Sequence, residues 1–176
     1  FPPLAVELRG TVEMTEIAEL VREISPLKDL VALGKLYRLI RRGKFDLVHT
    51  HSSKAGFLGR VAARLAGVPA IVHTPHGHVF GGYFDAARTR LYVLLERWAA
   101  TFTDRIIGLT EQEVRDHLEL RIGTRARFVS IASGVELERF RAPSLGSEVR
   151  AALGLPPDAF LIGSVGLNVG SPDRKG

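Results

Sequence analysis

The stretch FDLVHTHSSKAGFLGRVAARLAGVPAIVHT, at positions 45–74, decides the fold. Its two apolar runs, at 45–50 and 68–74, are short enough for strands and rich in branched residues. The segment between them, 52–67, has helical spacing and ends at Gly67, a common helix terminator. Neither run alternates between apolar and polar residues, as a half-exposed strand would. The pattern therefore predicts two parallel, buried strands joined by a helix.

The same alternation of strand and helix continues on both sides of this unit. Further strands are predicted within 104–110, 126–135 and 155–166, and further helices over 25–44, 89–102, 110–120 and 147–154. Ser25 and Pro26 are typical of a helix start, and Thr110 with Glu113 forms the T-x-x-E capping signature. The fold class predicted is α/β, a Rossmann-like parallel sheet with helices on both faces.

Composition places the chain among soluble globular proteins. It has 176 residues, 45% hydrophobic and 24% charged, with 24 basic and 19 acidic residues giving a net charge of +5. It has no cysteine, which excludes disulfides and thiolate chemistry and fits a cytoplasmic protein. The helix over 25–44 carries a basic cluster that is either a solvated face or a contact with an anionic membrane surface: Lys35, Arg38, Arg41 and Arg42.

Histidines gather after two successive strands, where parallel sheets place their ligands. His49 and His73 lie inside apolar runs and are interpreted as core residues, whereas His51, His76 and His78 are site candidates. His117, on a helix, is interpreted as a surface residue. The H-x-H spacing of His49 and His51 also suits a metal, so a metal-dependent hydrolase is an alternative. Few carboxylates are expected near these two histidines to complete a metal site, so we expect no bound metal.

The residues after the first of these strands offer a second kind of chemistry. Ser52, Ser53 and Lys54 begin the predicted helix, where free backbone N–H groups could bind a phosphate or a sugar hydroxyl. Plain capping of the helix by serine explains the same residues. The two roles are compatible.

Several segments together resemble the family 4 glycosyltransferases, also called glycosyltransferase group 1. The resemblance covers residues 45–80, TDRIIGLTEQEVRDHL (103–118), IASGVELERF (131–140) and FLIGSVG (160–166). It implies the GT-B architecture of two Rossmann-like domains. The expected division is an acceptor-side domain over 1–142, lacking its first strand or strands, a linker with a short helix over 143–158, and the start of a nucleotide-sugar-binding domain over 159–176.

The resemblance also implies an activity. Members transfer a sugar, with retention of configuration, from a nucleotide-sugar, here a UDP-sugar, to a glycan or lipid-linked acceptor in polysaccharide biosynthesis. No metal or other cofactor is expected, nor nucleic acid, and the enzyme would be cytoplasmic with peripheral contact to the inner face of the membrane. This stretch of chain alone is expected to be inactive. A sugar-nucleotide epimerase of the same architecture, or a non-enzymatic binding module, would also fit these segments.

The same resemblance implies roles for individual residues. His76 matches the family's catalytic histidine near the transferred sugar, in a loop with Gly77 and His78. The remaining expected residues are, on the acceptor side, His51, Ser52, Ser53 and Lys54; at the cleft edge, Thr110, Ser133 and Gly134; and at the donor phosphates, Lys175 with Arg174. Arg174 would replace the arginine that usually follows the last strand, where this chain has Leu167 and Asn168.

Overall fold

The computed structural model describes residues 11–21, 23–76, 85–135, 137–138 and 146–162. The chain divides into two compact units, Phe1–Ser133 and Gly134–Gly176. The expected domain boundary after residue 142 lies outside the described residues and stays a prediction.

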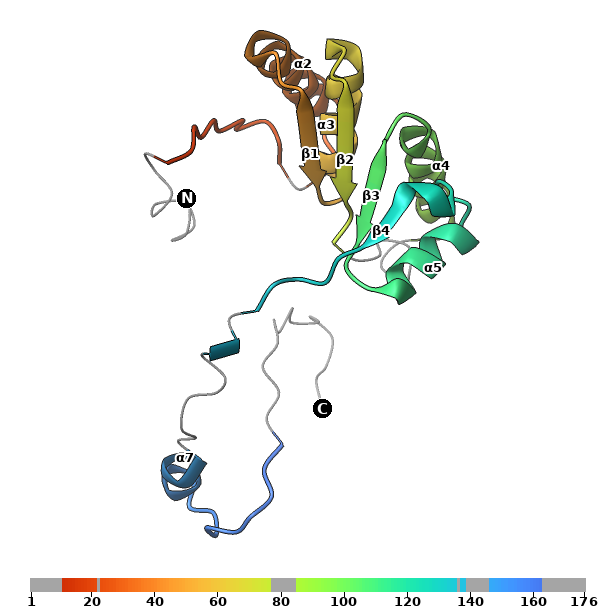
Figure 1. The fold of residues 1–176 in the computed structure, drawn as a ribbon. Helices are drawn as coiled ribbons and strands as arrows, with labels where there is room; N and C mark the ends of the chain where they lie inside the picture. The colour runs from red at the N-terminus through yellow and green to blue at the C-terminus, as the bar shows by residue number, and fades with distance from the viewer. Residues whose placement is uncertain (1–10, 22, 77–84, 136, 139–145, 163–176) are drawn as a thin grey trace. The chain divides into compact units, whose positions relative to one another are not determined.

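The first unit contains a parallel sheet (Figure 1). Its strands are β1 (Leu47–His51), β2 (Ala70–Thr74), β3 (Arg105–Gly108) and β4 (Phe128–Ser130), hydrogen-bonded in the order β1-β2-β3-β4. The register pairs Leu47 with Ala70 and His51 with Thr74. The carboxyl ends of β1 and β2 therefore lie level with each other. The prediction of an α/β, Rossmann-like parallel sheet is confirmed.

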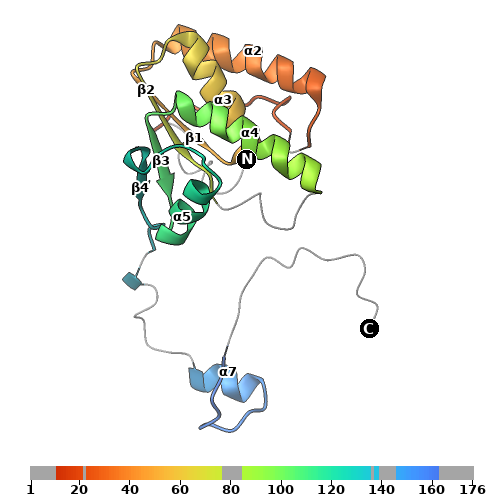
Figure 2. The same ribbon diagram turned by 90° about the vertical axis from the view of Figure 1, so that its right-hand side faces the viewer.

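The helices of this unit are α2 (Pro26–Gly43), α3 (Ser53–Ala66), α4 (Ala86–Thr101) and α5 (Glu111–Glu119), with a 3-10 turn at Arg125–Arg127. Figure 2 shows α2, α3 and α4 together on one side of the strands. Ile106 of β3 packs with Ala100 of α4 and Val114 of α5, so α5 covers that same face. No described helix is both long enough and apolar enough to cross a membrane.

The placement of these helices refines the expectation of helices on both faces. Along the chain, each strand is added to the same edge of the sheet, in the order β1-β2-β3-β4. Because the helical crossovers between parallel strands are right-handed, each crossover helix then lies on the same face of the sheet. On the opposite face, Leu47 is 52% exposed and Val129 is 41% exposed. Within the described part of the chain, α3, α4 and α5 therefore leave one face of the sheet open.

Two glycines let α3 lie directly on the sheet. An added Cβ at Gly56 would lie 2.4 Å from Cε1 of His73, and one at Gly59 would lie 2.9 Å from the Thr50 methyl carbon. An apolar core cluster joins α2, α3 and β2: Ile40, Ala62, Ala63, Ala66 and Ile71. A second cluster joins α4, α5, β3 and β4.

Helix starts follow the side chains that cap them. Thr110 Oγ1 accepts a hydrogen bond from the Glu113 N–H at 3.0 Å, as the capping signature predicts. Helix α4 begins at Ala86, three residues before the predicted start, because Asp85 Oδ1 accepts from the Arg88 N–H at 2.9 Å. Ser25 occupies the cap position of α2, but its side chain makes no cap bond.

His117 is not on the surface, contrary to its interpretation from the sequence. It is 2% exposed, its Nδ1 lies 2.8 Å from the Glu113 carbonyl oxygen, and its ring packs on Phe128 at 5.7 Å between centroids. The side of α5 that carries it faces β4. A lone histidine on a short helix gives no sequence signal of that orientation.

The described part of the second unit is mainly α7 (Gly146–Ala152). Gly154 follows it with a left-handed φ of +65°, which suits the predicted glycine terminator. Arg150 Nε donates to the Ala159 carbonyl oxygen at 2.9 Å. The strand predicted within 155–166 is absent over the described residues 155–162. None of the other described residues of this unit forms a strand that could complete a hydrogen-bonded ladder with them.

Candidate functional site

Three histidines meet at the carboxyl ends of β1 and β2. Alternation along β1 places His49 and His51 on the open face, with ring centroids 4.1 Å apart. His76 follows β2 by two residues, and its ring centroid lies 5.0 Å from that of His51. We call His49, His51 and His76 the histidine cluster.

Hydrogen bonds fix the cluster in place. His51 Nδ1 lies 2.8 Å from His76 Nε2, and His49 Nε2 lies 2.8 Å from Thr74 Oγ1. A bond between two imidazole nitrogens needs one N–H donor and one unprotonated acceptor. The bonded pair can therefore carry at most one positive charge.

Backbone strain surrounds the bonded pair. His76 has φ of 59°, and Ser52, directly after His51, has φ of 63° with ψ of 174°. L-residues rarely adopt these conformations, which cost about 1–3 kcal/mol each and cluster at functional sites. The Ser52 N–H donates to the Thr74 carbonyl oxygen at 3.1 Å, which holds the end of β1 against β2.

The surroundings favour neutral imidazoles. Partial removal from water, where its ring packs against its neighbours, lowers the pKa of His49 below its usual value, and the nearby His76 ring lowers it further. Burial also lowers the pKa of His51, with smaller contributions from His49 and His76. At neutral pH these rings are therefore uncharged, and each offers one donor and one acceptor nitrogen, the set that binds sugar hydroxyls.

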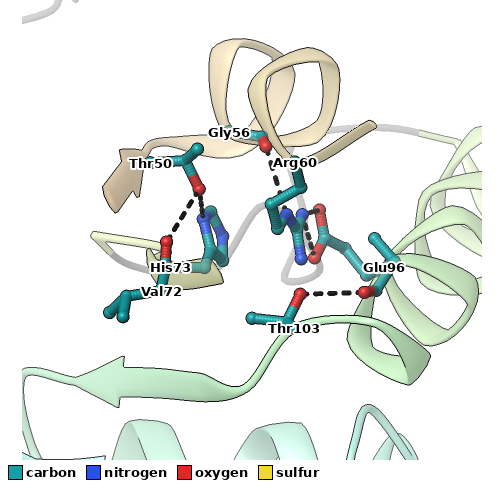
Figure 3. A network of polar contacts seen from close by, with 8 residues as sticks. Thr50, Gly56, Arg60, Val72, His73, Glu96 and Thr103 are labelled. Carbon is teal, nitrogen blue, oxygen red and sulfur yellow. Dashed lines mark hydrogen bonds and ion pairs between the residues drawn. The ribbon is translucent and has the colours of Figure 1, made fainter. Parts of the chain in front are cut away.

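His73 belongs to a different network on the covered face (Figure 3). It is 1% exposed, and its Nδ1 lies 2.9 Å from Thr50 Oγ1, which also donates to the Val72 carbonyl oxygen at 3.2 Å. Burial, with the nearby Arg60 guanidinium, lowers the pKa of His73 to about 2. His73 is thus a neutral core residue, as its position in an apolar run indicated.

Arg60 anchors the other half of this network. Its side chain is fully buried, and its NH2 group lies 2.7 Å from both carboxylate oxygens of Glu96 (Figure 3). Arg60 Nε also donates to the Gly56 carbonyl oxygen at 3.1 Å. This buried ion pair joins α3 to α4 beneath the sheet.

The predicted acceptor-side residues adjoin the histidine cluster. Ser52 and Ser53 follow His51 and begin α3, and Ser52 makes no side-chain capping bond, so simple capping does not explain it. Lys54 forms an ion pair with Asp29 and donates to the Glu23 carbonyl oxygen. Lys54 therefore also holds the segment before α2 against α3.

The other predicted residues lie farther along the sheet or outside the described residues. Thr110 follows β3 and caps α5, and Ser133 lies beyond β4. Gly134 is exposed and belongs to the second unit. The remaining predictions fall outside the described residues: Gly77, His78, Arg174 and Lys175.

His49, like His117, lies in a different environment from the one that the sequence indicated. Its apolar run indicates a core histidine, but it is exposed and its ring packs against that of His51. Its partner Thr74, 3% exposed, carries no sequence signal of a site either. The H-x-H alternation already places His49 and His51 on one face. The alternation does not indicate whether a helix covers that face, and in the described part of the chain none does.

The histidine cluster does not form a metal-ligand set by itself. Among the described residues, no group of three or more His, Asp or Glu side chains is placed to hold a metal ion. The cluster therefore presents hydrogen-bonding imidazoles at the sheet edge where parallel α/β folds bind ligands.

Comparison with known families accounts for this arrangement. The model of the glycosyl transferase 4-like domain matches residues 5–134, most of the chain. The chain belongs to this family. The matched region includes the whole described sheet and the histidine cluster. The resemblance to family 4 glycosyltransferases seen in the sequence is confirmed.

Relatives within this family are glycosyltransferases. An Escherichia coli UDP-Gal:alpha-D-GlcNAc-diphosphoundecaprenol alpha-1,3-galactosyltransferase is 39% identical over 166 residues, which is 93% of this chain and 43% of the relative. A D-inositol 3-phosphate glycosyltransferase of Actinosynnema mirum is 33% identical over 129 residues, 70% of this chain and 30% of the relative. The chain spans less than half the length of these relatives.

A solved structure shares the fold. The UDP-N-acetylglucosamine 2-epimerase from Rickettsia bellii matches with a TM-score of 0.54 and 19% identity, over 88% of this chain and 42% of the epimerase. At that identity the likeness concerns the fold alone. It supports the Rossmann-like architecture predicted from the strand and helix pattern.

Proposed function

We propose that the protein containing this chain is a glycosyltransferase that moves a sugar from a nucleotide-sugar to a lipid-linked acceptor. Family membership supports the reaction type, and the Escherichia coli relative, named for a diphosphoundecaprenol acceptor, supports the acceptor class. The observation that carries the proposal is the 2.8 Å bond between His51 and His76 at the carboxyl edge of the sheet.

The histidine cluster binds the reacting sugars in this proposal. The bond to His51 uses Nε2 of His76, so His76 donates to a sugar or phosphate oxygen through Nδ1 while His51 holds the ring in position. His76 also steadies the negative charge that develops as the nucleotide leaves, a role in which one donor contributes substantially to rate. His49 packs its tilted ring against that of His51 and so helps to hold it in place.

The donor is a UDP-sugar and the configuration at the transferred carbon is retained, as the family resemblance implies. We propose that transfer uses no resident metal. Arg174 and Lys175 bind the donor phosphates, and Thr110, Ser133 and Gly134 border the cleft.

A donor screen on the full-length protein tests the proposed function. Nucleotide release is measured with several UDP- and GDP-sugars, each with and without GlcNAc-diphosphoundecaprenol. We expect acceptor-dependent release of UDP, with or without added EDTA. Absence of acceptor-dependent release across the screen would overturn the proposal. Release that EDTA abolishes would overturn only the metal-free mechanism.

Contact with the membrane follows from the chemistry of the acceptor and from α2. Arg38 and Arg42 are exposed on the outward face of α2, with no ion-pair partner among the described residues. Basic side chains near an anionic surface contribute about 1 kcal/mol each. Replacing both by Glu should reduce sedimentation with anionic vesicles, whereas Arg64→Glu on α3 should not. Equal binding by all three proteins would remove this part of the proposal.

A further inference from the structure

A cavity of about 680 Å³ lies between α2, α3 and α4. This volume is within the usual range for pockets that bind small molecules. Its walls are mainly apolar and come from the segment before α2, from α3 and from α4: Leu20, Val21, Ile24, Phe57, Leu58 and Leu95. None of the residues of the histidine cluster lines it.

The charged groups on the cavity wall already have partners. Lys54 is paired with Asp29, and Glu96 with the fully buried Arg60. A charged ligand would find no uncompensated ion of opposite sign among these four side chains. The cavity therefore suits an apolar ligand better than an ionic one.

The cavity adjoins an exposed apolar patch. Ile24 lines the cavity and is also 63% exposed. The next turn adds Leu27, 82% exposed, and Leu30, 67% exposed. Apolar side chains exposed together are typical of a surface that contacts an apolar partner. Arg38 and Arg42 continue the outward face of α2, so cations flank this patch.

The cavity also reaches the candidate site. Ser52 and Ser53 line the cavity, and Ser52 directly follows His51. The cavity therefore adjoins both the polar histidine cluster and exposed apolar side chains. An amphiphile needs both kinds of neighbour, a polar site for its head and apolar walls for its chain.

We infer that this cavity binds the apolar isoprenoid chain of the lipid-linked acceptor, with the sugar end at the histidine cluster. The inference rests on the proposed function and adds a subsite to it. The first isoprene units lie against Phe57 and Leu95, and the chain leaves past Ile24 toward the bilayer. The patch of Ile24, Leu27 and Leu30 lets the chain pass from membrane to protein without exposure to water.

Titration calorimetry of the full-length protein tests this without turnover. The probes are farnesyl diphosphate and inorganic pyrophosphate, which share a headgroup and differ in the chain. Each buried CH₂ contributes about 0.8 kcal/mol and each 1.4 kcal/mol is a factor of ten, so burial of only a few chain carbons gives at least a tenfold preference. We therefore expect farnesyl diphosphate to bind at least about tenfold more tightly.

Two tryptophan substitutions on α3 localise the site. Ala55→Trp places an indole inside the cavity and should abolish the preference for farnesyl diphosphate, whereas Arg64→Trp, an exposed control outside it, should keep the preference. Ile24→Ser, at an exposed position, should reduce the preference several-fold even if Ala55→Trp fails to fold. Equal affinities for the two probes, or an unchanged preference in both cavity variants, would overturn the inference.

The calorimetry also separates this inference from the proposed function. Chain-dependent binding without sugar transfer would overturn the proposed function alone. Transfer without chain-dependent binding would overturn the inference alone.

Discussion

A close contact between α3 and the sheet gives a quantitative prediction at Gly56. An alanine there would place its Cβ 2.4 Å from Cε1 and 2.9 Å from Nδ1 of His73, and 3.2 Å from the His51 carbonyl oxygen. Carbon atoms prefer separations of about 3.5–4.0 Å, so a neighbour must move by about 1 Å. The His73 ring is buried and bonded to Thr50, and the His51 oxygen is backbone, so neither yields easily.

Overpacking of this kind costs about 1–3 kcal/mol, partly offset by the gain of about 1 kcal/mol when alanine replaces glycine inside a helix. We expect Gly56→Ala to lower the free energy of unfolding by up to about 2 kcal/mol. Gly34 is the matched control, because it lies inside α2 with nothing within 4 Å of an added Cβ. Gly34→Ala should raise stability by about 0.5–1 kcal/mol.

Urea unfolding followed by circular dichroism measures both variants. We expect the free energy of unfolding to fall in Gly56→Ala and to rise in Gly34→Ala. If Gly56→Ala were as stable as Gly34→Ala, the close packing of α3 on β1 and β2 described above would be wrong.

Two further predictions concern the network beneath the sheet. The folded pKa of His73 is about 2, far below its ordinary 6.5, so the free energy of unfolding should fall as the pH drops below 6.5. We expect a fall of about 2 kcal/mol between pH 7.5 and 5. In urea unfolding, His73→Gln should show a weaker dependence of this free energy on pH, and an unchanged dependence would count against a neutral buried ring. Arg60→Met should cost about 3–5 kcal/mol by leaving the Glu96 carboxylate unpaired, and Arg60→Met with Glu96→Leu should recover most of it. A double variant no more stable than the single one would contradict that pairing.

The strand and helix pattern was predictable because its signals are local. Gly67 ends α3 with a left-handed φ of +77°, and Thr110 caps α5 as its spacing with Glu113 indicated. The parallel sheet followed from apolar runs without alternation. The predicted start of α4, at Thr89, was three residues too late, because Asp85 caps the helix.

Burial was harder to predict, since it depends on which element packs over a residue. His49 and His73 occupy similar apolar runs, yet His73 lies under α3 and His49 lies on the open face. His117 is buried because α5 turns it toward Phe128. The clustering of His51 with His76 was predictable, because adjacent parallel strands end at one edge. Their direct hydrogen bond depends on the strained backbone at His76, and no sequence pattern predicts that backbone conformation.

A double-mutant cycle on sugar transfer tests the central claim most directly. Steady-state rates of the full-length protein are compared for wild type, His51→Ala, His76→Ala and the double variant, with Arg64→Ala as an exposed control. If the bonded imidazoles act as a unit, each single change lowers kcat by about 10- to 1000-fold, and the double variant loses little more than the worse single one. Wild-type rates in His76→Ala, or strictly multiplicative losses in the double variant, would contradict the account.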